Sequence, residues 1–242
     1  MITKNKVMLL ACTIIFVAAI TWLNKQDTPE NATLGLLKSN DIAEVIRKYD
    51  PEAWQKIYDG LLLIETKNKD PHEVGRALQP IVTNFIQGRL PFAADKNAID
   101  VGRSNLERLN LIAKDSKDNC LRALYPNIDG PVNGETILKI IPYEMGKRSE
   151  KATSDMVVSS YGPDKHQITE AESKQAVKDM QSIQKTLRAR FGTDINYWIS
   201  PPENFSKSSI ICDIEIAYWK EVLAAPVPRA AAIIRKLNSP AE

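Results

Sequence analysis

The chain has few of the residues on which metal and enzyme chemistry usually depends. It contains two histidines and three cysteines among its 242 residues. Neither His72 nor His166 belongs to an H-E-x-x-H motif, and no two cysteines form a C-x-x-C pair. We therefore expect no metal site and no cofactor.

Catalytic motifs are lacking as well. The ten glycines are scattered and form no phosphate-binding loop, and no serine lies in a G-x-S-x-G sequence. The sequence therefore indicates no catalytic residue. A pair of carboxylates needs no fixed spacing in the sequence, so this alternative stays open. Its candidates are Glu135, Glu144 and Asp155, which fall in the least regular part of the chain.

An excess of charge of one sign is also missing. The chain has 32 lysines and arginines against 30 aspartates and glutamates, and two of the lysines, Lys4 and Lys6, precede a long hydrophobic run. The chain from Lys25 onward is therefore formally neutral. Proteins that bind nucleic acids need a basic face, so we expect no nucleic-acid partner.

The long hydrophobic run covers residues 7–23 and carries no charge. As a helix it would be about 26 Å long, at the short end for a hydrocarbon core of about 30 Å. Lys4 and Lys6 precede the run, and Trp22 lies at its far end, where aromatic side chains suit the membrane interface. This pattern predicts a single-pass inner-membrane anchor with the C-terminal domain in the periplasm.

Two other interpretations of this segment remain. In the first, the run is a signal peptide that is cleaved after the small residues Val17-Ala18-Ala19, which would release the protein into the periplasm. In the second, Leu9-Leu10-Ala11-Cys12 is the lipobox of a lipoprotein. The second is the weakest, because the apolar lead-in is short and the run continues past Cys12.

The predicted organisation has three parts. Residues 1–24 form the signal anchor or signal peptide, residues 25–32 a polar tether, and residues 33–242 an exported helical domain. A turn cluster at residues 127–134, N-I-D-G-P-V-N-G, is the best candidate for a boundary between subdomains.

The cysteines predict one disulfide. Cys12 lies in the hydrophobic run, which leaves Cys120 and Cys212 in the exported part. An oxidising compartment favours a bond between them. The alternative is two buried thiols that never meet, since cysteine is often a small core residue.

The hydrophobic periodicity is that of an all-α protein. Apolar residues recur at helical spacing, and no alternating run of strand length occurs. Asp50-Pro51 and Asp70-Pro71 are typical helix starts, and Thr169-x-x-Glu172 is a capping box. We predict an irregular bundle of about seven to nine helices arranged as αα-hairpins, preceded by one N-terminal hydrophobic helix.

The sequence leaves residues 143–167 without an assigned structure. Within them, Met156-Val157-Val158 fits a strand or the end of a helix equally well. A later loop places Tyr197 and Trp198 shortly before Pro201-Pro202. Loop aromatics of this kind either pin the loop to the core or present an anchor to a partner, and pinning is the commoner use.

These observations favour a non-catalytic exported or membrane-tethered protein that binds another cell-envelope protein, of the scaffold or inhibitor (immunity) type. Tyr197 and Trp198 are the candidate partner-binding residues. The alternative is an envelope enzyme, such as a cell-wall hydrolase, with a carboxylate pair in a cleft between helices.

Overall fold

The computed structural model describes residues 29–67, 71–126, 130 and 132–239. The hydrophobic run at residues 7–23 lies outside the described residues, and so do residues 25–28, the first half of the predicted tether. No helix in the described part is long and apolar enough to span a membrane.

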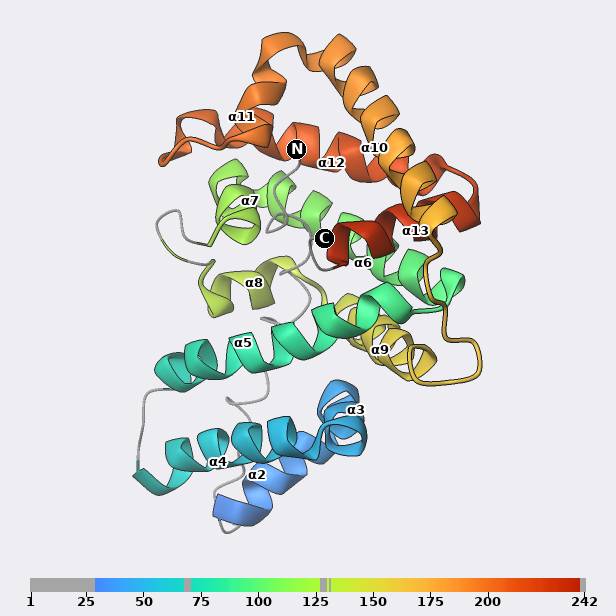
Figure 1. Cartoon of the computed structure of the whole chain (residues 1–242). Helices are drawn as coiled ribbons and strands as arrows, with labels where there is room; N and C mark the ends of the chain where they lie inside the picture. The colour runs from blue at the N-terminus through green and yellow to red at the C-terminus, as the bar shows by residue number, and fades with distance from the viewer. Residues whose placement is uncertain (1–28, 68–70, 127–129, 131, 240–242) are drawn as a thin grey trace.

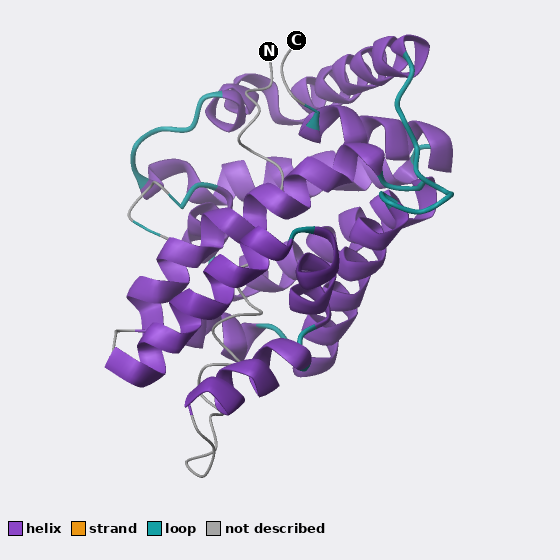
Figure 2. Ribbon diagram, turned by 60° about the horizontal axis from the view of Figure 1, so that its bottom comes forward, coloured by secondary structure: helices purple, strands orange, loops and turns teal. Residues whose placement is uncertain are grey.

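The prediction of an all-α protein is confirmed for the described residues, which form helices and loops but no strand (Figure 2). The elements are α2 (Pro29–Lys38), α3 (Asp41–Tyr49), α4 (Pro51–Lys67), α5 (Pro71–Arg89), η2 (Leu90–Phe92), α6 (Asp95–Asp115), α7 (Lys117–Leu124), α8 (Gly134–Ile140), α9 (Tyr143–Ser159), α10 (Glu170–Phe191), η3 (Gly192–Asp194), α11 (Ile195–Ile199), η4 (Phe205–Lys207), α12 (Ser208–Ala224) and α13 (Val227–Asn238). Helices α2 to α13 exceed the predicted seven to nine.

Local signals in the sequence correctly mark several helix ends. The Asn40 side chain accepts a hydrogen bond from the amide of Ala43 and caps α3. The Asp50 side chain does the same for the amide of Ala53, ahead of Pro51 at the start of α4. At α10, Thr169 and Glu172 form the predicted capping box. Such ends are predictable because each depends on residues within one turn.

Helices α2, α9 and α11 were not predicted. Helix α2 begins at Pro29, so the end of the predicted tether is helical, with proline in the first turn. Helix α9 covers most of the segment that the sequence left unassigned, and Met156-Val157-Val158 is the end of this helix rather than a strand. The buried face of α9 includes polar residues, which hides its periodicity: Ser149, Glu150, Thr153 and Ser154.

In Figure 1, α2, α3 and α4 lie at one end of the molecule, and α10, α11 and α12 lie at the other. Helix α6 crosses between these ends and packs against α7, α9, α12 and α13. Helix α12 is buried along most of its length, because apolar residues cover a wide part of its circumference. It contacts α6, α7, α10, α11 and α13.

The crossing of α6 with α12 and α13 depends on Gly102. A Cβ atom at this position would lie 3.0 Å from Cδ1 of Ile234 and 3.2 Å from Cζ3 of Trp219. Both neighbours are almost fully buried, so neither side chain has free space into which to move. The close approach of the three helices therefore favours glycine at position 102 and leaves a larger residue little room.

We expect Gly102→Val to lower the free energy of unfolding by about 1 to 3 kcal/mol, because it overpacks this contact. Urea denaturation followed by circular dichroism measures the change. Gly146→Val in α9 is the matched control, since a Cβ there meets nothing within 4 Å. Equal losses in the two variants would show that helix propensity, and not packing at Gly102, sets the cost.

Candidate functional site

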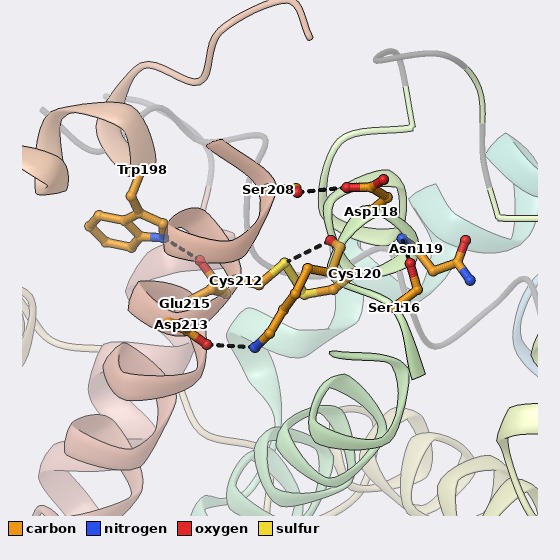
Figure 3. Close-up of a disulfide and its surroundings, with 10 residues drawn as sticks. Ser116, Asp118, Asn119, Cys120, Trp198, Ser208, Cys212, Asp213 and Glu215 are labelled. Carbon is orange, nitrogen blue, oxygen red and sulfur yellow. Dashed lines mark hydrogen bonds and ion pairs between the residues drawn. A yellow bond between two sulfur atoms is a disulfide. The ribbon is translucent and has the colours of Figure 1, made fainter. Parts of the chain in front are cut away.

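The predicted disulfide is present and joins α7 to α12. Cys120 and Cys212 are both fully buried, and their Cα atoms are 6.2 Å apart. The two cysteines are 92 residues apart in the sequence. The bond therefore ties the middle of the chain to its second-last helix (Figure 3).

Two polar contacts flank the disulfide and connect the same two helices. The Lys117 ammonium lies 2.6 Å from a carboxylate oxygen of Asp213. On the other side, the Ser208 hydroxyl donates to the Asp118 carboxylate at 2.6 Å. Figure 3 shows Asp213, Ser208 and Asp118 around the two cysteines. They fix the orientation of α7 on α12 and indicate a structural role for this region.

Trp198 and Tyr197 do not occupy equivalent places. The Trp198 side chain is 1% exposed, and its indole N–H donates to the Glu215 carboxylate at 2.5 Å (Figure 3). An indole this deeply buried offers no surface to a partner, so Trp198 holds its segment against the core. Tyr197 keeps partial exposure, and the Lys207 ammonium lies 4.6 Å from its ring centroid.

Glu215 is the centre of a buried polar cluster on α12. Its carboxylate accepts hydrogen bonds from the indole N–H groups of Trp198 and, at 2.9 Å, of Trp219. The side chain is fully buried. Burial, together with the negative charge of Glu215, raises the pKa of the Tyr125 and Tyr218 hydroxyls above the ordinary tyrosine value. Both hydroxyls therefore stay protonated to a higher pH than that of an ordinary tyrosine.

The other buried carboxylates also have structural partners. Glu150 on α9 accepts from the amide of Asp41 at 2.7 Å and from the Lys147 ammonium at 3.0 Å. Asp179 on α10 accepts from Gln175 and forms a two-pronged ion pair with Arg229 on α13. With Glu215, these carboxylates lie on three different helices. Each one helps to hold a helix in place.

The Arg229 guanidinium lowers the pKa of the Asp179 carboxyl below its ordinary value. The ion pair therefore contributes stability that is fully present above about pH 4 and is lost as the pH falls through the folded-state pKa. We expect Asp179→Asn to be less stable than the wild type at pH 5 to 7, with the difference shrinking below about pH 4. Denaturation across pH measures it. Asp164→Asn, which removes a carboxylate from an exposed loop, is the control.

The carboxylates considered for an enzyme lie apart from these buried groups. Glu135 and Glu144 are exposed in the first turns of α8 and α9. Asp155 accepts from the Lys151 ammonium one turn away at 2.9 Å. Of the two histidines, His166 has its Nε2 atom 3.1 Å from Glu172. In the described ranges, no group of three or more histidine, cysteine, aspartate and glutamate side chains is placed to hold a metal ion.

A cluster of aromatic rings and cations lies at the surface where α3, α5 and α9 end. The Tyr49 and Tyr161 rings stack with centroids 4.1 Å apart and planes 3° from parallel. The guanidinium carbon of Arg89 lies 3.8 Å from the Tyr161 ring centroid and 5.1 Å from that of Phe92. We call this cluster the Arg89 surface, and its members are Lys48, Tyr49, Arg89, Phe92, Tyr161 and Lys165.

Hydrogen bonds hold Arg89 in this position. Its Nε atom donates to the Ser160 hydroxyl at 3.0 Å, and one terminal nitrogen donates to the Ser160 carbonyl at 2.8 Å. Ser160 is fully buried at the end of α9, and its hydroxyl donates in turn to the carbonyl of Val157. The guanidinium is therefore fixed by the backbone of α9 before any ligand is bound.

The sequence does not indicate the Arg89 surface, because its members come from three separate segments, residues 48–49, 89–92 and 161–165. Tyr49 falls at helical spacing with the apolar residues of α3, and its side chain is half-buried. The one signal for Tyr161 in the sequence is its place in a loop beside a helix end, and this signal is weak on its own.

Comparison with known proteins adds no further assignment. No protein-family model, no curated protein and no solved structure is similar to this chain.

Proposed function

We propose that this chain is a non-catalytic helical protein of the cell envelope, membrane-tethered or exported, that binds another envelope protein as a scaffold or inhibitor. The observation that carries the proposal is the Arg89 surface. Tyrosine and arginine are, with tryptophan, the residues enriched where protein interfaces gain their binding energy. Tyr161 is 39% exposed and its neighbour Val158 is 42% exposed, so apolar area is accessible there.

The use of the buried carboxylates also supports a binding role over the hydrolase alternative. A catalytic acid needs a raised pKa and a position facing a second carboxylate. Asp179 has a lowered pKa instead, and Glu150 and Glu215 accept hydrogen bonds within the fold. These groups stabilise helix packing, which leaves the surface as the better candidate for function.

The Cys120–Cys212 bond supports the proposed location. Disulfides that connect distant segments persist in oxidising compartments such as the periplasm and are rare in the cytosol. The export segment proposed at residues 7–23 agrees with this chemistry.

Site-specific photo-crosslinking in intact cells tests the proposal. A photoreactive phenylalanine analogue would replace Tyr161, the exposed Tyr143 at the start of α9, or Gln181 on the exposed face of α10. We expect at least one position to form an adduct with a single envelope protein, and we expect the two purified proteins to rebind. No adduct from any position, together with release of wall fragments by the purified chain, would support the hydrolase instead.

A further inference from the structure

We propose that the Arg89 surface binds a carboxylate-bearing segment of the partner protein, and that Arg89 is the residue that receives the carboxylate. This inference rests on the proposed binding function and adds the place and the chemistry of recognition. Three features of the surface carry it: a guanidinium held ready for an acceptor, cations that outnumber the carboxylates next to them in the sequence, and exposed apolar area around them.

The first feature is the state of Arg89. Arginine has five N–H donors in one plane, and Arg89 uses two of its nitrogens to hold Ser160. The rest of the fork has donors for an incoming acceptor, and the Arg89 side chain is only half-buried. Carboxylates match the planar fork well. Because the side chain is already fixed by Ser160 and two rings, binding costs little conformational entropy.

The second feature is the charge of the surface. The Lys48 ammonium lies 4.8 Å from the Tyr49 ring centroid, and the Lys165 ammonium lies 5.0 Å from that of Phe92. Among the described residues, the ion pairs involve other side chains than Lys48, Arg89 and Lys165. These cations therefore keep their charge at the surface, where it attracts an acidic partner.

Two carboxylates lie close to the Arg89 surface in the sequence. Asp50 follows Tyr49, and its side chain caps α4 by accepting from the amide of Ala53 at 3.0 Å. Asp164 precedes Lys165 and is exposed. Together these two carboxylates offset two of the three positive charges of Lys48, Arg89 and Lys165, which leaves one positive charge in excess. The surface is therefore suited to a segment with a few carboxylates and not to a densely charged polyanion.

The third feature distinguishes a protein segment from a small anion or a lipid headgroup. Half of the Arg89 surface consists of rings, and the stacked Tyr49 and Tyr161 rings extend it beside the exposed Val158. A small anion would use the cations and leave the rings in water. A peptide can contact both, with its carboxylate on Arg89 and its backbone or apolar side chains on the rings.

Selection from a displayed library of random peptides on the purified full-length chain tests the inference. We expect the selected peptides to be enriched in aspartate and glutamate, and to bind less tightly as the salt concentration rises. For the synthetic versions, Arg89→Ala and Tyr161→Ala should each raise the Kd about tenfold or more. Lys48→Ala with Lys165→Ala should raise it about threefold to tenfold.

Arg190→Ala is the matched control, because Arg190 also lies over a ring, that of Phe191 at 5.0 Å, but on α10 and away from the Arg89 surface. Its Kd should equal that of the wild type. Circular dichroism checks the fold of each variant. If Arg89→Ala does not fold, two variants take its place: Arg89→Lys, and Lys48→Ala combined with Lys165→Ala. The side chains of Lys48 and Lys165 are both exposed. Arg89→Lys keeps the charge but loses the fork, so it should also weaken binding.

Several outcomes would overturn the inference. Selected peptides without acidic enrichment, or with equal affinity for Arg89→Ala, would do so. Binding of vesicles that contain anionic lipid, lost in Arg89→Ala while peptides fail to bind, would assign the surface to a membrane. A dimer of the chain that Arg89→Ala dissociates would assign it to a second copy. If photo-crosslinking finds a partner from Gln181 or Tyr143 but never from Tyr161, the proposed function stands and this inference fails.

Discussion

Replacing Cys120 and Cys212 together by alanine is expected to lower the free energy of unfolding by about 4 to 5 kcal/mol. The bond closes a loop of 92 residues. Without the bond the unfolded chain has more conformational entropy, and for so long a loop this gain accounts for a loss of stability of this size. Alanine is the suitable replacement because both sites are fully buried and leave no water for a serine hydroxyl. Guanidinium denaturation measures the change.

A reducing agent serves as the internal control for this prediction. It should bring the denaturation midpoint of the wild type down to that of the double alanine variant, and it should leave the variant unchanged. Cys12 is present in both proteins and so cancels in the comparison. A wild type with the same midpoint in oxidising and reducing buffer would show that the bond contributes nothing to stability.

Replacing Glu215 by leucine is expected to lower the free energy of unfolding by about 2 to 5 kcal/mol. The change leaves the indole N–H groups of Trp198 and Trp219 without their acceptor in a fully buried place. Each buried donor that loses its partner costs about 1 to 3 kcal/mol. Urea denaturation followed by tryptophan fluorescence reports both the stability and the environment of the two indoles.

Two further variants separate the hydrogen bonds from helix propensity. Glu215→Gln keeps one carbonyl oxygen as an acceptor, so its loss should be smaller than that of Glu215→Leu. Glu221→Gln, on the exposed side of the same helix, should change the stability by less than about 0.5 kcal/mol. A leucine variant as stable as the wild type would mean that the indoles find other acceptors.

The buried cluster around Glu215 also explains why Tyr197 and Trp198 differ, with Trp198 buried and Tyr197 partly exposed. The sequence placed Tyr197 and Trp198 in a loop before two prolines, and loop residues are normally at the surface. The structure instead has a short helix, α11, that turns Trp198 toward α12. The carboxylate that accepts the hydrogen bond from the indole is that of Glu215, 17 residues further along the chain. Glu215 lies among the apolar residues of α12, so the hydrophobic periodicity of the sequence does not indicate its role.

The sequence by itself determined the helical class and several helix ends, and it favoured the bond between Cys120 and Cys212 over two separate thiols. Helix ends follow from caps and prolines within one turn, and the two cysteines outside the hydrophobic run allow only one bond between them. Tertiary packing decided the rest. It buried the polar face of α9 against its neighbours, and it brought Tyr49, Arg89 and Tyr161 together from three helix ends. Contacts of this kind depend on how whole helices cross, which no short stretch of sequence encodes.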